Sequence, residues 1–415
     1  MPPPIDQLRH DALRCLQAGI AAVRGRARVR ELLARDIPES PLYLVAVGKA
    51  ASDMTRGALE ACGDRLAAGL VITKHGHLDP GLIGRPRLEC LEAGHPVPDA
   101  ASLEAGARLV AFVEAAPHRA QLLFLVSGGA SSLVEVLPDG VTLADLVRLN
   151  QWLLASGLNI EQMNAARSAL SCIKAGRLAR RLGRRGARAL LLSDVRGDDP
   201  AVIGSGLLVP GSAGAQAELP AWARALAGAA PSRPGPEEVT GVQVHIVARL
   251  SDALEGAGRE ARALGYSLNL HDNFVDGDAA AAGEGLARAL IASPAGAHLW
   301  GGETTVRLPA QPGRGGRCQH LSLAAARVLA GRSGTVLLAA GTDGSDGPGE
   351  DAGAVIDGAT LQRGAAQGLD AERCLRAVDA GTFLEASGDL VQTGPTGTNV
   401  MDVIIGLTVR PGQSQ

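Results

Sequence analysis

Short apolar runs recur along the chain, and most end in Gly, Ser or Asp just before a stretch with helical periodicity. The clearest are LYLVAV (42–47), LLFLV (122–126), ALLL (189–192), VQVHIV (242–247), HLW (298–300) and TVLLAA (335–340). Strands that alternate with loops and helices in this way predict an α/β protein whose parallel sheet is covered by helices. Ligands of such sheets bind beyond the carboxyl ends of the strands, so we expect the polar loops there to be functional.

The chain has 415 residues, which is more than one hydrophobic core usually serves, and two domains are therefore expected. The stretch richest in Pro, Gly and Ser covers residues 209–241, and the boundary is placed near residue 236. The predicted domains are thus residues 1–235 and 236–415, with a cleft between them.

Composition narrows the class of protein. Aromatic residues make up only 2% of the chain against 46% hydrophobic residues in total, so the core must be built from Ala, Leu and Val in tightly packed layers. A net charge of −3, with no interleaved basic and aromatic residues, argues against a nucleic-acid partner. No apolar run approaches the roughly 18 residues that a membrane helix needs. The six cysteines are widely spaced without a CxxC pair, as expected for reduced thiols in the cytoplasm.

The segment AAGTDGSDGPGEDAGAV (339–355) combines glycines with Asp343, Asp346, Glu350 and Asp351. A backbone this free to turn can present amides beside carboxylate oxygens, a combination that suits a hydrated divalent cation and a phosphate. A solvated acidic turn is the alternative interpretation.

Two further loops follow apolar runs and open helices. Gly48-Lys49 would place an ammonium where a helix N-terminus already favours an anion. The segment SGGASS (127–132) adds hydroxyls and two glycines that let a phosphate approach the backbone; its candidate ligands are Ser127, Gly128, Gly129 and Ser131. A surface lysine and an ordinary serine cap are the alternatives.

The segment NAARSALSCIKAG places Asn164, Arg167, Ser171 and Lys174 at spacings of three, four and three. On one continuous helix these donors share a stripe beside an apolar face, which predicts an anion clamp.

Other polar residues follow apolar runs or glycines. Asp194 comes after a buried run and, like Asp199 further along the same loop, could hold a cation or take a proton; an ordinary turn residue is the alternative for both. Arg317 follows a glycine run and suits phosphate or carboxylate, whereas Arg314 is expected to be a surface residue. The remaining candidates for a phosphate or sugar pocket are Glu303, Thr396 and Asn399. His75 and His77 have ligand-like spacing but no third partner nearby, which favours core or surface histidines over a metal site, and a structural role is favoured for His95.

Anion-binding loops, an arginine and an acidic glycine-rich loop together indicate phosphoryl transfer assisted by a divalent metal, because that chemistry depends on positioning and charge neutralisation. The chain has no GxxxxGK[ST] loop and no HRD or DFG motif, so it is neither a P-loop NTPase nor a protein kinase.

The motifs in this order resemble those of the glycerate 2-kinase family with a MOFRL C-terminal domain, whose bacterial members have also carried the label hydroxypyruvate reductase. The blocks that carry the resemblance are VGKA, HPVPD, SGGASSL, NAARSALSCIKAGRLA, SDVRGDDPAVIGSG, GGETTV, GGRCQ, GTDGSDG and TGPTGTNV. The resemblance implies a large Rossmann-like N-terminal domain and a smaller C-terminal α/β domain. It also implies transfer of the ATP γ-phosphoryl group, with Mg²⁺, to the 2-hydroxyl of D-glycerate, and it is compatible with a homodimer.

Position by position, the resemblance implies catalytic roles for Lys49, Arg317 and Asp194. Lys49 is assigned to the transferring phosphoryl group, and Arg317 to its developing charge or to the glycerate carboxylate. Asp343 and Asp346 are candidates for Mg²⁺. Some positions depart from the family pattern. Cys318 and His320 replace an Asn and a Glu, Ala175 replaces a Gly, and Leu207 replaces a Pro. These departures bear on substrate identity more than on fold.

Two alternatives remain. An NAD(P)H-dependent hydroxypyruvate reductase would need a glycine fingerprint after a strand, but the nearest match, GAGREA (256–261), lies within a helical pattern. A non-catalytic sugar-acid or phosphate sensor would use the same anion-binding loops without needing the acidic one.

Overall fold

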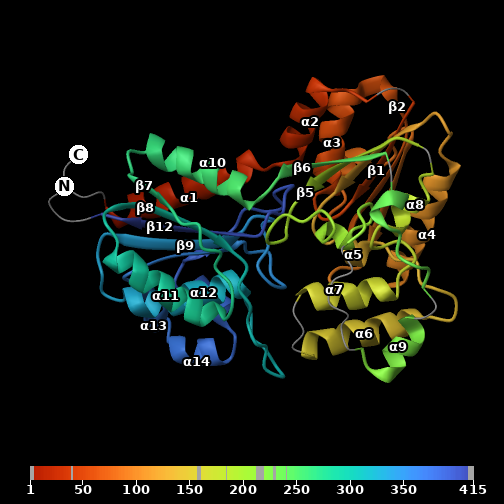
Figure 1. Ribbon diagram of the computed structural model, residues 1–415. Helices are drawn as coiled ribbons and strands as arrows, with labels where there is room; N and C mark the ends of the chain where they lie inside the picture. Colours follow the sequence, from red (N-terminus) through yellow and green to blue (C-terminus); the bar gives the residue numbers. More distant parts are fainter. Residues whose placement is uncertain are drawn as a thin grey trace. The chain divides into compact units, whose positions relative to one another are not determined.

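The computed structural model describes residues 4–38, 41–156, 160–183, 185–211, 219–227, 230–239 and 241–409. These residues form two compact units. The parallel-sheet unit holds residues 24–249 and 397–399, and the mixed-sheet unit holds the described residues of 1–23, 250–396 and 400–415. Figure 1 shows the elements of each.

The units do not follow the boundary expected near residue 236. Strand β6 (Val242–Ala248) extends the parallel sheet by pairing with β5 (Ala187–Leu192). The parallel-sheet unit therefore continues to residue 249, and the mixed-sheet unit resumes at residue 250. At the other end, helix α1 (Ile5–Ala22) packs on the mixed sheet rather than on the parallel one. The Pro-rich stretch of residues 209–241 therefore precedes the last strand of the parallel sheet and does not mark a boundary between units.

The parallel sheet contains β1 (Leu42–Val47), β2 (Leu66–Lys74), β3 (Leu88–Ala93), β4 (Gln121–Val126), β5 and β6. Their order is β3-β2-β1-β4-β5-β6 and every pairing is parallel. This confirms the α/β prediction for the first part of the chain. It is also the strand order of doubly wound nucleotide-binding sheets, in which ligands bind where the order reverses, here between β1 and β4.

Helices cover both faces of this sheet. Helices α2 (Gly25–Arg35) and α3 (Ala51–Cys62) pack on one side, and α4 (Ala100–Ala115), α5 (Ala130–Leu133) and α8 (Arg177–Arg180) bury Leu and Val side chains against the other. Helices α6 (Leu143–Ala155), α7 (Ile160–Ala169) and α9 (Ala221–Ala227) share a separate small apolar cluster. Single 3₁₀ turns lie at Gly63–Arg65, Pro80–Leu82, Ile203–Ser205 and Pro236–Glu238.

Asp99 in the HPVPD segment caps α4. Its Oδ1 accepts the Ser102 N–H at 2.9 Å, and the Ser102 hydroxyl accepts the Asp99 N–H at 3.1 Å. His75 contacts the other carboxylate oxygen at 2.8 Å. Burial alone would raise the pKa of Asp99, but the hydrogen bonds from His75, Ser102 and Gly94 outweigh it and lower the pKa to about 2.

Asp99→Ala should lower the free energy of unfolding by about 1 kcal/mol, the usual effect of losing an N-cap. Because the folded pKa is below the ordinary value of 3.8, the carboxylate stabilises the fold above pH 3.8, and this contribution is lost as the pH falls through about 2. Urea unfolding between pH 2.5 and 7 measures both effects. Asp99→Asn keeps an acceptor but cannot titrate, so it should retain most of the cap at pH 7; equal losses in both variants would contradict the capping role.

The mixed sheet contains β7 (Leu268–Leu270), β8 (Gly296–Gly302), β9 (Thr335–Gly341), β10 (Gly353–Asp357), β11 (Leu390–Val391) and β12 (Asp402–Thr408). Their order is β11-β10-β9-β12-β8-β7, and only β7 and β8 pair in parallel. The expectation of a parallel sheet is therefore wrong for this part of the chain. The physical reason is that β12, the last strand, lies between β8 and β9 and runs antiparallel to both.

Helices α1 and α10 (Leu250–Ala263) pack on one face of the mixed sheet, and α11 (Ala279–Ala292) and α12 (Arg317–Leu329) on the other (Figure 1). Helices α13 (Thr360–Ala366), α14 (Ala371–Arg376) and α15 (Ala380–Ala386) pack around α12. The core is rich in Ala and Leu, as the composition predicts. Within the described ranges, no helix combines the length and the apolar character that crossing a bilayer requires.

Candidate functional site

The loops after β1 and β4 are joined where the strand order reverses. The Lys49 N–H donates to the Gly128 carbonyl at 2.9 Å, and the Ala50 N–H donates to the Ser127 hydroxyl at 3.1 Å. Ser127 is fully buried, so its hydroxyl holds the loops together instead of facing a ligand. The two predicted anion-binding loops thus form one structure at the position where doubly wound sheets bind ligands.

Two glycines allow other side chains to approach this structure. A Cβ at Gly128 would collide with the carboxylate of Asp194 and the amide of Asn399. Gly129 has φ +84°, and a Cβ there would collide with the ring of His95. The structure therefore brings Asp194 and Asn399 beside the loop, and adds His95, for which the sequence favoured a purely structural role.

Ser131 lies on the wall of a cavity of about 200 Å³. Its hydroxyl is hydrogen-bonded to that of Ser205 at 2.7 Å. We call this cavity the Arg167 pocket; its lining residues are His95, Pro96, Pro98, Gly129, Ser131, Ser132, Leu146, Asn150, Arg167 and Lys174. Three of the predicted ligands, Ser131, Arg167 and Lys174, thus share one cavity with Gly129.

The predicted helical stripe from residue 164 to residue 174 is wrong, because α7 ends at Ala169. The Ser171 hydroxyl accepts the N–H groups of Ile173 at 3.3 Å and Lys174 at 3.2 Å, a local bond that competes with helix continuation. Ala175 and Gly176 follow with positive φ, so the backbone turns away. Lys174 therefore reaches the cavity of Arg167 through this turn and not along a continuous helix face.

Lys174 forms a buried ion pair. Its ammonium lies 2.5 Å from Glu135 Oε2, and the side chains are only 3% and 0% exposed. The lysine charge is therefore already neutralised within the protein, which the sequence did not predict because the partner lies 39 residues away. Its role in binding phosphate stays a prediction.

Lys174→Met should lower the free energy of unfolding by about 3–5 kcal/mol, because it leaves the Glu135 carboxylate buried without its partner. The double variant Lys174→Met, Glu135→Leu should regain most of that loss, since no unpaired charge then remains. Chemical denaturation of the two variants and the wild type measures the difference. A double variant as unstable as the single one would show that packing, not charge, dominates here.

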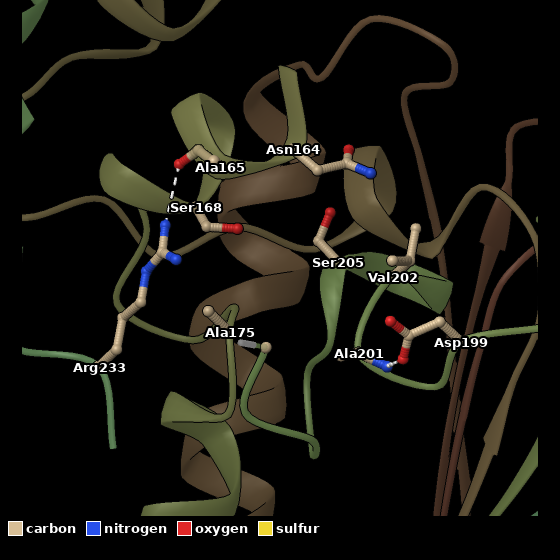
Figure 2. A pocket seen from close by; sticks show the side chains of 10 residues that line it. Asn164, Ala165, Ser168, Ala175, Asp199, Ala201, Val202, Ser205 and Arg233 are labelled. Carbon is tan, nitrogen blue, oxygen red and sulfur yellow. Dashed lines mark hydrogen bonds between the residues drawn. The ribbon is translucent and has the colours of Figure 1, made fainter. Parts of the chain in front are cut away.

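A second cavity, of about 160 Å³, is lined by Asn164, Ser168, Asp199, Ser205 and Arg233 among others (Figure 2). Arg233 donates to the Ala165 carbonyl at 3.1 Å, and Asp199 accepts the Ala201 N–H at 2.9 Å, as expected of a turn residue. Asn164 therefore faces a different cavity from Arg167, although its Oδ1 lies 3.5 Å from Arg167 Nη1.

Arg317 is the first residue of α12 and is held by two carboxylates. Its Nε and Nη2 donate to Asp402 at 2.6 and 2.9 Å, and its Nη1 lies 2.8 Å from Glu303. Asp402 begins β12, in register with the last residues of β8 and β9. Asp402 was missed as a site residue, and the available signal was its position at the end of TGPTGTNVMD, just before the final apolar run.

Burial by itself would lower the pKa of the Arg317 guanidinium, but the charges of Asp402 and Glu303 outweigh it and raise the pKa above its usual value. Arginine has five N–H groups, and the three contacts to Asp402 and Glu303 leave two for an anion. The guanidinium is thus permanently charged and held in one orientation.

The acidic loop connects β9 to the antiparallel β10, not a strand to a helix. Asp346 is buried and caps α12, since its oxygens accept the N–H groups of Cys318 at 3.0 Å and Gln319 at 2.8 Å. Burial raises the pKa of Asp346 to about 7, against the opposing effect of these hydrogen bonds. Asp343 accepts the Ser345 N–H at 3.0 Å. In the described part of the chain, no three Asp, Glu, His or Cys side chains are grouped to hold a metal.

Other predicted residues of the mixed-sheet unit have identifiable structural contacts. The buried Thr396 hydroxyl donates to the Thr342 carbonyl at 2.6 Å. Arg314, predicted to be a surface residue, forms ion pairs with Asp351 of the acidic loop at 2.9 Å and with Glu385. Of the residues that depart from the family pattern, Cys318 and His320 are both buried. Burial raises the pKa of the Cys318 thiol and lowers the pKa of His320, so both are uncharged at neutral pH.

The predicted site residues thus fall into two groups. The parallel-sheet unit holds Lys49, Ser127, Gly128, Gly129, Ser131, Asn164, Arg167, Lys174, Asp194 and Asn399, and the mixed-sheet unit holds Glu303, Arg317, Asp343, Asp346 and Thr396.

Comparison with known proteins relates both units to one family. Residues 11–227 match a family described as a domain of unknown function (DUF4147), and residues 296–402 match the MOFRL family. D-glycerate 2-kinase of Thermotoga maritima is 36% identical over 97% of this chain and 99% of its own length. A relative from Agrobacterium vitis, 39% identical over 89% of this chain and 88% of its own length, carries instead a provisional hydroxypyruvate reductase name.

The fold agrees with these relationships. The crystal structure of glycerate kinase from Thermotoga maritima superimposes with a TM-score of 0.85 at 35% identity, covering 97% of this chain and 100% of that one. Similarity over nearly the whole length of both chains, in sequence and in structure, confirms the resemblance of the motifs. The chain belongs to the glycerate kinase family, with MOFRL as its C-terminal part.

Proposed function

We propose that this protein is a glycerate 2-kinase, which transfers the γ-phosphoryl group of ATP to the 2-hydroxyl of D-glycerate and releases 2-phospho-D-glycerate and ADP. The observation that carries the proposal is the joined pair of loops that presents Lys49 at the reversal of the strand order, where doubly wound sheets bind phosphate-bearing ligands. The two names of the Thermotoga maritima relatives support the substrate.

The residues of the parallel-sheet unit suit the nucleotide and the acceptor. Lys49 would neutralise charge on the transferring phosphoryl group, while Gly128 and Gly129 keep the backbone accessible to phosphate oxygens. Asp194, beside Gly128, would accept the proton of the 2-hydroxyl of D-glycerate. The hydroxyl oxygen would then bond to the γ-phosphorus while the bond from that phosphorus to ADP breaks. The other proposed contacts to substrate or phosphate are Ser131, Asn164, Arg167, Lys174 and Asn399. The buried Ser127 is proposed to act through the loop that its hydroxyl holds in place.

In the mixed-sheet unit, Arg317 would stabilise charge that develops on the phosphoryl oxygens, with Glu303 and Asp402 fixing its orientation. Thr396 is proposed to act by shaping the surrounding loop. Mg²⁺, when bound with ATP, would neutralise phosphate charge, and it is usually held by one or two carboxylates together with the phosphates. Asp343 and Asp346 are the proposed carboxylates; both oxygens of Asp346 also accept backbone N–H groups, and Asp343 Oδ1 accepts the N–H of Ser345.

Incubation of the purified protein with D-glycerate, ATP and Mg²⁺ should release ADP, which a coupled assay detects. Phosphorus NMR of the product distinguishes 2-phosphoglycerate from 3-phosphoglycerate. Hydroxypyruvate with NADH or NADPH, followed by nicotinamide absorbance, should show no turnover. Nicotinamide oxidation without any ADP formation would overturn the proposal.

The reductase alternative has one observation in its favour, since the same strand order serves dinucleotide-binding proteins. The nearest match to its glycine fingerprint, however, has a different role. The GAG of residues 256–258 lies inside α10, and Gly256 approaches Ala18, Gly19 and Ala22 of α1 so closely that a Cβ would collide with them. Gly256 therefore serves the packing of α10 on α1, and a Cβ at Gly258 would collide with Leu268 of β7, so both glycines serve packing and not a pyrophosphate.

Three further predictions concern the setting of the enzyme. All six cysteines are free thiols, which agrees with a cytoplasmic location. The partners are D-glycerate and ATP, without nucleic acid or membrane. A homodimer stays a prediction, and light scattering of the purified protein tests it.

A further inference from the structure

No carboxylate among the described residues compensates the charge of Arg167. Its Nε donates to Asn150 Oδ1 at 2.9 Å and its Nη1 to Asn164 Oδ1 at 3.5 Å, and both partners are neutral amides. Within the described residues, no carboxylate forms an ion pair with it. Burial lowers the pKa of Arg167, and no carboxylate acts in the opposite direction. Partly burying a guanidinium without a counter-charge is costly, so the arrangement requires an explanation.

The other charged group that lines the Arg167 pocket does not supply this explanation. The Lys174 ammonium is neutralised by Glu135, so that pair adds no net charge. The pocket therefore has one uncompensated positive charge, from Arg167, beside the neutral hydroxyls of Ser131 and Ser132. Pro96, Pro98 and Leu146 give it an apolar wall.

We propose that the Arg167 pocket binds the carboxylate of the acceptor acid, with Arg167 as its ligand and Asn150 as a positioning residue that orients the guanidinium. This inference rests on the proposed kinase function and extends it, because it assigns the selection of a 2-hydroxy acid over an uncharged polyol to one side chain. Gly129 lines the same pocket, which places the carboxylate next to the loop proposed for the transferring phosphate.

Charge and geometry favour a carboxylate over a nucleotide phosphate. A carboxylate has one negative charge, which matches the single uncompensated cation, whereas a terminal phosphate carries more. Two of the five N–H groups of Arg167 are engaged by amides, which leaves three and permits two parallel hydrogen bonds to a planar carboxylate. A cavity of about 200 Å³ is also small compared with pockets for large ligands, which suits a three-carbon acid.

A ligand-binding role and a structural role predict opposite effects on stability. If Arg167 exists to bind substrate, removing its unpaired charge relieves a cost in the folded protein, so Arg167→Gln should be at least as stable as the wild type. If Arg167 is structural, the same change should destabilise the fold. Asn150→Asp places a carboxylate beside the guanidinium, which should compete with the substrate carboxylate, at the cost of the bond from Asn150 Nδ2 to the Leu146 carbonyl.

The test measures KM for D-glycerate and for ATP, kcat, and the melting temperature of the wild type, Arg167→Gln and Asn150→Asp. Both variants should raise KM for D-glycerate, by about 100-fold for Arg167→Gln, with KM for ATP unchanged. The preference of the wild type for D-glycerate over glycerol, which lacks the carboxylate, should largely disappear in Arg167→Gln. Arg180→Gln is the matched control, because Arg180 is an exposed arginine of the same unit paired with Glu238.

The outcomes separate this inference from the kinase proposal. A raised KM for ATP with an unchanged KM for D-glycerate would assign the pocket to the nucleotide and overturn the inference while the kinase function stands. A lower melting temperature in Arg167→Gln with both KM values unchanged would show a structural role and also overturn it. If the wild type forms no ADP, D-glycerate should still raise its melting temperature and not that of Arg167→Gln; the kinase proposal would then fail and the carboxylate site would stand.

Discussion

Replacing Arg317 with alanine should lower kcat for phosphoryl transfer by about 10³- to 10⁵-fold, the range measured for an arginine that stabilises a transferring phosphoryl group. The geometry supports so large an effect because Asp402 and Glu303 fix the guanidinium, and two N–H groups remain available to the phosphoryl oxygens. Arg317→Lys should recover little of the loss, because an ammonium cannot reproduce the planar pair of hydrogen bonds to Asp402.

Stability complicates this test, because Arg317→Ala also leaves the buried Asp402 carboxylate without its partner. The double variant Arg317→Ala, Asp402→Asn removes that unpaired charge, so it should recover the melting temperature but none of the activity. Arg327→Ala is the matched control, since Arg327 lies on the same helix and pairs with Glu284 and Glu372 at the surface. Activity that returned with stability in the double variant would show that Arg317 serves the fold and not the reaction.

The parts of the fold that depend on local signals could be predicted from the sequence. Strands β1, β4 and β5 are buried apolar runs that end in glycine-rich or polar turns, and their parallel pairing follows from the helical segments between them. The mixed sheet could not be predicted in this way, because its character depends on β12. That strand is more than 60 residues away in sequence from β8 and β9, between which it pairs, and no local sequence pattern predicts its position there.

The same distinction applies to the site. Lys49 and the segment from Ser127 to Gly129 follow β1 and β4 closely. The alternation of strands and helices was therefore enough to predict that both loops lie at the same edge of the parallel sheet. The segment from Asn164 to Lys174 has perfect helical spacing, yet the Ser171 hydroxyl ends the helical hydrogen bonding and Lys174 turns to Glu135. Asp402 was missed for a related reason, since its importance comes from Arg317, 85 residues away. Side-chain pairing over long distances decides which charges remain available to a ligand.

Lys49→Met should lower kcat by about 10²- to 10³-fold, the usual effect of removing one group that stabilises developing charge. The loop should remain in place, because its connection to Gly128 is made by the Lys49 backbone N–H and its connection to Ser127 by the backbone N–H of Ala50. Neither bond depends on the lysine side chain, so both should persist in the variant. Lys49→Arg keeps a positive charge and should retain more activity than Lys49→Met.

Lys74→Met is the matched control, because Lys74 ends the neighbouring strand β2 and is only partly buried. It should keep wild-type kcat and KM for ATP. The expected pattern for Lys49 is a fall in kcat that exceeds any rise in KM for ATP, since an ammonium that meets the phosphoryl group during transfer contributes more to the transition state than to the bound nucleotide. A rise in KM for ATP at constant kcat would instead make Lys49 a ground-state phosphate ligand, and the task of stabilising the transfer would then fall to Arg317 alone.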